Sequence, residues 1–372
     1  MKKFSWIRRL CLLLVSAMVP GLLVGCGGGF SDSKPENTVP STPMPSPMDT
    51  QAYNQARSSS LIGIWYSIWY DLYASNSLWD DAGGEIFYRP LLPDGTYGKY
   101  ASWDDEIIQF HLKEITDAQI DFIIMDQTNM VDNPRSNLNT SSIKMAKAIT
   151  AWNQKEGNRK IRYCSAIGAL ATKDNMELLD SEAEKIYTRY VAHSSGRGSE
   201  ENHLYVDGKP LLVVFNCYFT EQEWKEYQKT NETPYMDKFT VRFSTGHVFE
   251  GNYGQWGWVM PDGPQIDEDV AVMMPGWYKI GYTSPFVFRE RGKAYESAWK
   301  ELLASEIVPK HVVINSFNEY AEHTAVFTAK TDLFPSDYEI EPWLDSSGEE
   351  NPSLYWDMTK AYIEKFKNGD RN

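Results

Sequence analysis

The segment "RGKAYESAWKELLASE" (residues 291–306), followed by "KHVVINSFN" (310–318), decides the fold of this chain. The first stretch places apolar residues at helical spacing with charged residues between them, which predicts an amphipathic helix. The second is a short apolar run with polar residues on both sides, which is typical of a strand buried on both faces. A helix that leads into such a strand is the repeating unit of an α/β fold with a parallel sheet.

The same alternation continues along most of the chain. Strands are predicted within residues 61–70, 120–126, 159–167, 203–216, 238–245, 254–259, 269–277 and 310–318. Helices are predicted within residues 102–119, 141–154, 173–190, 220–229, 291–306 and 353–366. Such a series of strands alternating with helices predicts a (β/α)8 TIM barrel. A doubly wound open sheet is the alternative, although no glycine-rich phosphate loop follows any of these strands.

The N-terminus has the pattern of an export signal. Four basic residues, within "MKKFSWIRR" (1–9), precede a mostly apolar run that ends "LLVGC" at Cys26. This ending resembles a bacterial lipobox, so we expect a lipoprotein signal peptide over residues 1–25 and a lipid on Cys26. An ordinary signal peptide or an uncleaved anchor is the alternative. The lipoprotein interpretation places the protein in the bacterial cell envelope, anchored to a membrane by its lipid alone, on the outer-membrane surface or the periplasmic face.

Residues 26–58 are rich in Gly, Ser and Pro and show no hydrophobic period, which predicts a disordered linker. Residues 59–372 contain no further low-complexity break and no repeat of solenoid length. They are long enough for one domain with a large core. We therefore expect a single catalytic domain over residues 59–372, and a monomer.

The charge of the chain restricts its partners. The formal net charge of −15 becomes −19 when the four basic residues of the signal are removed. Such an acidic surface argues against nucleic acid and favours neutral or cationic ligands. The remaining cysteines, Cys164 and Cys217, lie in or beside apolar runs, and both buried free thiols and a disulfide are open. No Cys/His zinc pattern occurs, and we expect no metal and no cofactor.

Aromatic residues make up 14% of the chain, with 13 Trp and 22 Tyr. Their flat apolar faces and polar edges suit stacking on sugar rings. Active sites of TIM barrels lie at the carboxyl ends of the strands, and most of the predicted strand ends of this chain carry an aromatic, an acid or an amide residue. Each residue alone also fits a core or rim position, but together they predict a carbohydrate cleft. The candidate substrate-binding residues are Trp65, Tyr66, Trp69, Tyr70, Asp71, Asp126, Asn129, Asn216, Tyr218, Trp256, Trp258, Trp277, Tyr278, Asn318 and His323.

Two glutamates, Glu319 and Glu322, follow the last predicted strand in "NSFNEYAEHTAV" (315–326). Glycosidases need two carboxyl groups beside the scissile bond, one to protonate the leaving oxygen and one to act as base or nucleophile. A turn at the strand end would bring both side chains into one cleft. An exposed helix face also produces this spacing, so the pattern alone leaves both interpretations open.

The same region resembles glycoside hydrolase family 99, which comprises endo-α-mannosidases and endo-α-mannanases, and its family 71/99-like relatives among bacterial lipoproteins. The first-strand stretch "GIWYSIWYD" (63–71) and "YVDGKPLLVVFNCY" (205–218) are similar to segments of that family. The residues that match its C-terminal motifs are Arg291, Gly292, Tyr295, Trp299, Ser316, Phe317, Asn318, Glu319, Glu322 and Thr324.

The resemblance implies hydrolysis of an α-mannoside with retention, through a 1,2-anhydro sugar. It implies that Glu319 is the base that assists the 2-hydroxyl and that Glu322 is the acid that protonates the leaving sugar. No metal or organic cofactor is implied. The chain departs from the family at Tyr320, Ala321 and His323, where Trp, His and Gly are usual, and also at Asn216, where Asp is usual. These departures indicate a changed recognition of the sugar.

Three functions are therefore open. The first is a glycoside hydrolase acting on an α-linked poly- or oligosaccharide, with endo action favoured over exo action. The second is a glycan-binding lipoprotein on a degenerate glycosidase barrel. The third is another hydrolase such as an esterase, against which the absence of a G-x-S-x-G nucleophile turn counts. His323 serves either as a base or sugar ligand, or as a structural partner of a neighbouring group.

Overall fold

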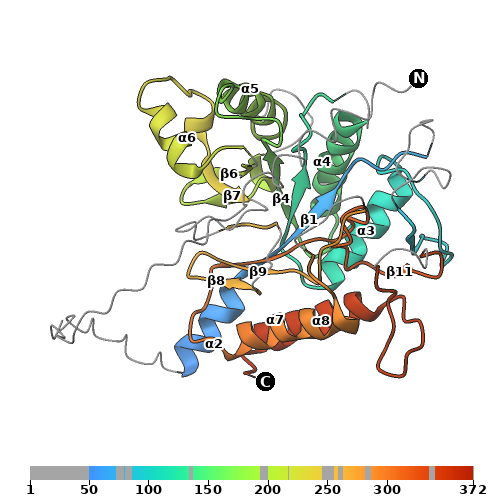
Figure 1. Ribbon diagram of the computed structural model, residues 1–372. Coiled ribbons are helices and arrows are strands. Elements are labelled where there is room, and N and C mark those ends of the chain that lie inside the picture. Colours follow the sequence, from blue (N-terminus) through green and yellow to red (C-terminus); the bar gives the residue numbers. More distant parts are fainter. Residues whose placement is uncertain are drawn as a thin grey trace, which may run out of the picture. The chain divides into compact units, whose positions relative to one another are not determined.

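The computed structural model describes residues 50–72, 79, 86–133, 137–192, 200–216, 218–244, 255–258, 263–280, 286–334 and 340–371 (Figure 1). The predicted signal peptide, Cys26 and Cys217 lie outside the described residues. Residues Thr50–Asn372 form one compact unit. Within the described part of this unit, no helix combines the length and the apolar character needed to cross a membrane.

A parallel sheet forms the centre of the unit, and its strand order follows the chain. From one edge to the other the order is β9, β10, β1, β3, β4, β6 and β7. A doubly wound sheet would reverse direction at a switch point, and this order never does, which excludes that alternative. The bounds of these strands are β1 Leu61–Ser67, β3 Phe122–Asp126, β4 Arg162–Ile167, β6 Lys209–Phe215, β7 Thr240–Ser244, β9 Val270–Met273 and β10 His311–Ile314.

The other strands of the described residues are short and pair antiparallel. β5 (Tyr205–Val206) pairs with β6, β8 (Gln265–Ile266) pairs with β9, and β2 (Arg89–Pro90) pairs with β11 (Ala329–Lys330) in a separate ribbon. The main helices cover the sheet, and α7 and α8 lie side by side (Figure 1). Their bounds are α2 Thr50–Ser59, α3 Asp105–Asp117, α4 Leu138–Gln154, α5 Glu177–Ile186, α6 Glu221–Gln228, α7 Lys293–Ala304 and α8 Leu354–Asn368.

Side chains of the parallel strands alternate between two buried clusters, as the two-residue period of a strand requires. The outer cluster, which includes Ile62 and Ile64 of β1, packs against the helices. The inner cluster joins Trp65 of β1 to β6 and β9, at or near the two ends of the sheet order, through residues such as Leu211 and Val270. One shared cluster reaches strands so far apart only because the sheet curls around it, as in a barrel.

The described residues leave the closure of this curled sheet open. Residues 254–259 were expected to form a strand, but the described part, 255–258, is irregular and makes one backbone bond to β7, from Trp256 N–H to Phe243 O at 2.8 Å. A side-chain contact also spans the gap between the edge strands, since Arg242 of β7 pairs with Asp269 beside β9 at 2.8 Å. The predicted α/β class and the curled sheet of a TIM-type fold are confirmed. Among the described residues, the strand pairs do not form a closed ring.

The expected end of the linker at residue 58 is corrected by α2. Residues 50–59 form a helix that belongs to the compact unit, and both Tyr53 and Arg57 are buried. The Arg57 guanidinium donates to Leu302 O at 3.1 Å and to Leu303 O at 2.6 Å, at the carboxyl end of α7. Unpaired carbonyls at a helix end attract such a cation. No sequence pattern marks this helix, because amphipathic helices are recognised by an apolar stripe and α2 is held by only two side chains, Tyr53 and Arg57.

One of the two remaining cysteines is described. Cys164 of β4 is a buried free thiol of the inner cluster, and burial raises the pKa of this thiol well above its usual value. This outcome agrees with the interpretation of Cys164 as a core residue.

Arg57→Ala is expected to lower the free energy of unfolding by about 2–4 kcal/mol, because it removes the guanidinium donor of the Leu303 carbonyl and the second donor of the Leu302 carbonyl. Chemical denaturation of the purified protein measures the change. Gln55→Ala, at an exposed position of the same helix, is the matched control and should lie within about 0.5 kcal/mol of the wild type. Equal stabilities of the two variants would show that the contacts of Arg57 contribute nothing to the stability of the folded unit.

Candidate active site

The chain after β10 folds into a compact turn that carries both predicted glutamates. Ser316 holds the turn from within, because its Oγ accepts from Glu319 N–H at 2.9 Å. Thr324 N–H donates to Glu319 O at 3.1 Å, which closes the turn. Phe317 N–H donates to Trp65 O at 2.8 Å and fixes the turn to β1. Glu319 and Glu322 are therefore loop residues at the carboxyl end of two neighbouring strands, rather than residues of an exposed helix.

Glu319 lies at the base of this turn, and only 2% of its surface is exposed. Its Oε1 accepts from the backbone N–H groups of Ala321 at 2.9 Å and Glu322 at 3.2 Å. Its Oε2 contacts the hydroxyl of Ser67, at the end of β1, at 3.0 Å. Both oxygens thus have partners, but none of these partners carries a charge.

Glu322 has different surroundings. Its Oε2 accepts from the indole N–H groups of Trp258 at 2.5 Å and Trp277 at 3.0 Å. Its Oε1 forms an ion pair with Lys279 Nζ at 2.8 Å. The side chain is 18% exposed, so the ion pair is shielded from water without being fully enclosed. Three donors therefore surround the Glu322 carboxylate.

These surroundings move the pKa values of the two carboxyl groups in opposite directions. Burial raises the pKa of Glu319 to about 8, and the negative charge of Glu322 adds to this effect. Burial also works to raise the pKa of Glu322, but the ammonium of Lys279 and the indole hydrogen bonds outweigh it and lower that pKa. The environments thus push the two pKa values apart, which is the pattern by which acid and base pairs are recognised.

Asp126 adds a third carboxyl group to the same edge of the sheet. It ends β3 and lies opposite Ser67 in the register of β1 and β3. Its Oδ1 accepts from the backbone N–H and the hydroxyl of Thr128 at 3.1 and 2.7 Å. Burial is the main cause that raises the pKa of Asp126 to about 7; the Thr128 bonds oppose this shift, and the charge of Glu322 adds to it. Asp126 therefore titrates near neutrality.

A network of amides and indoles supports the site from below. Asn318 bonds the backbone N–H and carbonyl of Ser67 at 2.7 and 2.9 Å, so it holds the end of β1 against the turn. Trp258 O accepts from Asn315 Nδ2 at 3.0 Å, which ties residues 255–258 to the end of β10. Gly257 fits between them with a φ of 121°, and a Cβ there would lie 2.8 Å from Trp65 Nε1. The close approach requires glycine.

The predicted site residues divide into groups by position. Those placed around the two glutamates are Asp126, Trp258, Trp277, Tyr278 and Asn318, with Tyr278 N–H bonded to Glu322 O at 3.1 Å. Those buried in the clusters beneath the site are Trp65, Tyr66, Tyr70 and Trp256. The remaining candidates make other contacts. Trp69 packs on the outer cluster, Asp71 accepts from Asn137, and Asn216 donates to Phe219 O. Asn129 is exposed, and Tyr218 forms an isolated β-bridge with Thr172.

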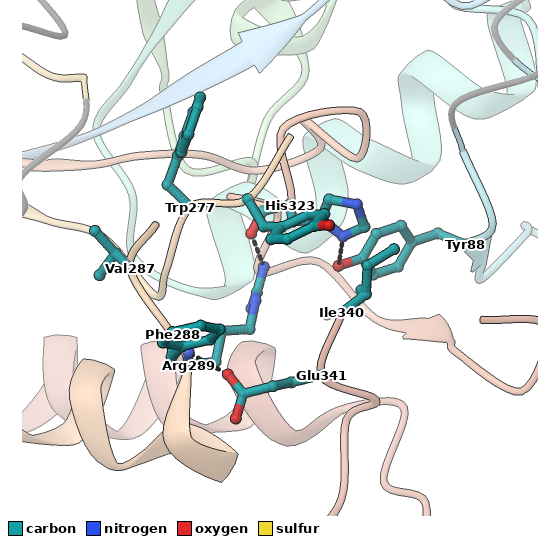
Figure 2. Close-up of a pocket in the computed structure, with 9 residues that line it drawn as sticks. Tyr88, Trp277, Val287, Phe288, Arg289, His323, Ile340 and Glu341 are labelled. Carbon is teal, nitrogen blue, oxygen red and sulfur yellow. Dashed lines mark hydrogen bonds between the residues drawn. The ribbon is translucent and has the colours of Figure 1, made fainter. Parts of the chain in front are cut away.

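His323 lies beside the glutamates in sequence but turns to other partners. Its Nδ1 meets the hydroxyl of Tyr88 at 2.9 Å, and Arg289 donates to its backbone oxygen at 2.5 Å (Figure 2). Burial, with the charge of Arg289, lowers the pKa of His323 to about 3, so the ring is neutral. These contacts place His323 in the wall of a small pocket with Tyr278, Phe288 and Glu341, which favours the structural interpretation of this residue.

Sequence reasoning missed Lys279 and Ser67, which contact Glu322 and Glu319. Lys279 follows the aromatic pair Trp277 and Tyr278, and the only signal was a basic residue beside an expected strand end. Ser67 lies inside the aromatic run of the first strand, where its hydroxyl gave no signal. Within the described residues, no group of three or more His, Cys, Asp or Glu side chains is arranged to hold a metal ion.

The raised pKa of Glu319 predicts a pH-dependent stability. Between about pH 4.5 and 8 the folded state binds this proton more tightly than the unfolded state, so the contribution of Glu319 to stability falls as the pH rises through that window. Glu319→Gln removes this loss. Urea denaturation measures the free energy of unfolding of the variant and of wild type at each pH. The variant's value minus the wild-type value should increase by on the order of a few kcal/mol from pH 5 to pH 9.

Glu301→Gln, on an exposed position of α7, is the control for that comparison and should follow the wild type at every pH. A constant difference between Glu319→Gln and wild type across the range would contradict the raised pKa.

Comparison with known proteins identifies the fold. No protein-family model matches the sequence, and no curated protein matches it. Two solved structures of a GH99 endo-alpha-mannosidase from Bacteroides thetaiotaomicron are similar, each over 83% of this chain and 98% of the other. The first has a TM-score of 0.53 at 15% identity, and the second, in complex with bis-tris-propane, has 0.56 at 17%. The chain therefore has the fold of a GH99 endo-alpha-mannosidase, as the resemblance implied.

Proposed function

We propose that this protein is a retaining glycoside hydrolase that cleaves α-mannosidic bonds in a poly- or oligosaccharide. The observation that carries the proposal is the pair Glu319 and Glu322, held in one turn at the carboxyl edge of the sheet with pKa values shifted in opposite directions. The fold shared with two solved structures of an endo-alpha-mannosidase supports the substrate class. We further propose a closed (β/α)8 barrel, endo action and a monomer.

The reaction needs one proton donor and one proton acceptor. The donor protonates the oxygen of the leaving sugar while the acceptor takes the proton of the 2-hydroxyl, whose oxygen bonds to C1 to give a 1,2-anhydro sugar. Water then opens this ring at C1, and the two carboxyl groups return to their first states. Net retention follows from two displacements at the same carbon. The resemblance implies that Glu319 is the acceptor and Glu322 the donor.

The aromatic groups around the pair suit a sugar substrate. Trp258 and Trp277 direct their indole N–H groups to Glu322, and Trp277 also lines the pocket of Figure 2 with Tyr278. Indole and phenol faces favour pyranose rings, whose C–H groups are apolar. The acidic surface of the protein is compatible with a neutral glycan.

A glycan-binding protein without hydrolytic activity is the second candidate. The observation that favours it is the ion pair of Lys279 with Glu322, because a carboxylate with three donors is well satisfied and resists protonation. The protein would then hold α-linked glycans on the same surface without cleaving them.

Activity on a glycan panel decides between these candidates. The full-length protein, purified in mild detergent, is incubated with α-mannans, α-glucans and N-glycans, and new reducing ends are counted. Wild type should release reducing ends from α-mannans, whereas Glu319→Gln and Glu322→Gln should each lose activity by about 10²–10⁴-fold. The control Glu301→Gln should match wild type. Binding by all four proteins without release from any glycan would support the binding protein instead.

We also propose that Cys26 carries the lipid that anchors the protein in the cell envelope. Its support is the sequence pattern of residues 1–26. Cys26→Ala should move the protein from the membrane to the soluble fraction of a bacterial expression host, as measured by fractionation and immunoblotting. A variant that stays with the membrane would contradict the lipid anchor.

A further inference from the structure

We propose that Asp126 is a substrate-binding residue that selects the sugar at the point of cleavage, by accepting a hydrogen bond from a ring hydroxyl other than the 2-hydroxyl. This inference rests on the proposed function and deepens it, because it names the residue that recognises the sugar. The roles of Glu319 and Glu322 are unchanged.

The sheet directs the Asp126 side chain into the interior at the carboxyl edge. Side chains of a strand alternate between the two faces, and Ile124, two residues before Asp126 on β3, belongs to the inner cluster. Trp65 of β1 belongs to the same cluster, so Ser67 points inward in the same way. Asp126 lies opposite Ser67 in the register, and the Ser67 hydroxyl contacts Glu319 at 3.0 Å. Asp126 therefore lies one strand away from the residue that holds Glu319.

Small side chains lie on both sides of Asp126. Its register partner on β4 is Ala166, a member of the inner cluster, and its register partner on β1 is Ser67. Asp126 is thus the longest of the interior side chains at these three strand ends. Neither neighbour in the sheet has a side chain long enough to cover its carboxyl group.

One oxygen of Asp126 is held by the protein, and the other is left for a ligand. Oδ1 accepts from the backbone N–H of Thr128 at 3.1 Å and from its hydroxyl at 2.7 Å, which fixes the orientation of the carboxyl group. Oδ2 has no hydrogen-bond partner among the described residues, although only 4% of the surface of Asp126 is exposed. A carboxylate oxygen is an acceptor, so Oδ2 suits the O–H of a sugar.

The position of Asp126 is costly in the free protein. Within the part of the chain that the structure describes, no cation is paired with it, and the charge of Glu322 acts against its ionisation. The charge of Asp126 in turn acts against the ionisation of Glu319. A buried carboxyl group without a cation lowers stability, and such groups gather where a ligand uses them. A sugar hydroxyl supplies the missing partner, because it donates a hydrogen bond without adding charge.

Aromatic rings complete the place for the sugar. The centroid of the Trp258 ring lies 5.1 Å from that of Trp65 and 6.3 Å from that of Phe215, which ends β6. The indole N–H of Trp258 reaches Glu322. The interior at the carboxyl edge thus combines flat apolar faces with the free carboxylate oxygen of Asp126. A pyranose ring needs both, for its C–H faces and for its hydroxyl groups.

The 2-hydroxyl is assigned to the glutamate pair, because the proposed reaction transfers its proton to one of the two carboxyl groups. Asp126, one strand further, meets another hydroxyl of the same ring. A hydrogen bond to a charged group contributes about 10–100-fold to affinity, and a site built to bind a hydroxyl rejects the analogue that lacks it. Asp126 therefore discriminates between sugars that differ at this hydroxyl.

A double-mutant cycle between protein and sugar tests the contact. Full-length protein in the Glu322→Gln background binds without cleaving, and isothermal titration calorimetry measures its affinity for an α-mannooligosaccharide. Analogues lacking the 3-, 4- or 6-hydroxyl of each ring in turn are measured in the same way. Asp126→Ala should weaken binding of the parent glycan by about 10–100-fold. Asp117→Ala, at an exposed position of α3, is the matched control and should leave the affinity unchanged.

One deoxy analogue should bind about 10–100-fold more weakly than the parent glycan when Asp126 is present. With Asp126→Ala the same analogue and the parent should bind equally, because the lost hydroxyl no longer has its partner. If every analogue loses the same factor with and without Asp126, the contact does not exist and the inference is wrong.

Stability without glycan separates ligand binding from a structural role. Asp126→Asn keeps an acceptor at Oδ1 for Thr128 and removes the carboxyl charge. Because burial raises the pKa of Asp126 to about 7, wild type carries this buried charge at about pH 9 but not at about pH 5. The urea midpoint of Asp126→Asn should therefore equal that of wild type at the lower pH and exceed it at the higher pH. A variant less stable than wild type at both would make Asp126 a structural partner of Thr128 and overturn the proposal.

The outcomes separate this inference from the proposed hydrolase. If wild type binds the α-mannooligosaccharide without releasing reducing ends, the hydrolase fails and the binding cycle still decides the role of Asp126. If wild type is active and Asp126→Ala keeps its affinity and kcat/KM, the role of Asp126 is overturned while the hydrolase stands. If wild type binds no α-linked glycan, both are overturned.

Discussion

The ion pair of Lys279 with Glu322 is the interaction on which the organisation of the site depends. Glu322 belongs to the turn after β10, and Lys279 belongs to the chain after β9. The indoles of Trp258 and Trp277 donate the other two hydrogen bonds to the Glu322 carboxylate. Three segments that are distant in sequence thus converge on one carboxylate. A buried charge is costly unless it is paired and hydrogen-bonded, so the position of each segment constrains the others. The asymmetry between Glu322 and Glu319 follows from this arrangement.

The fold makes the convergence possible. The strand order follows the chain around a curled sheet, so the carboxyl ends of β9, β10, β1 and β3 are neighbours. Glu319 reaches Ser67 on β1, and Ser67 lies opposite Asp126 on β3. The inner cluster of apolar side chains beneath them keeps water from the lower part of the sheet. The site therefore lies directly on the apolar core, where burial and neighbouring groups shift the pKa values of the carboxyl groups.

Sequence reasoning reached the α/β architecture and the two glutamates because both follow from local patterns. Apolar runs alternating with amphipathic helices predict the sheet, and acids directly after a buried strand predict a site. Lys279 and Ser67 escaped because their importance depends on which strand ends become neighbours. The helix α2 escaped because Arg57 acts through carbonyls of α7, far away in sequence. The role of His323 stayed open at the level of sequence, because its contact with Tyr88 likewise depends on the fold.

The stereochemistry of the first product is the sharpest measurement of the proposed retaining mechanism. A proton NMR spectrum of an α-mannan digest, recorded within minutes of adding the enzyme and before mutarotation, shows the anomer that is released. The proposed mechanism predicts new reducing ends in the α configuration, because an acid and a base acting through a 1,2-anhydro sugar invert the same carbon twice. Release of the β anomer, or a spectrum without new reducing ends, would contradict it.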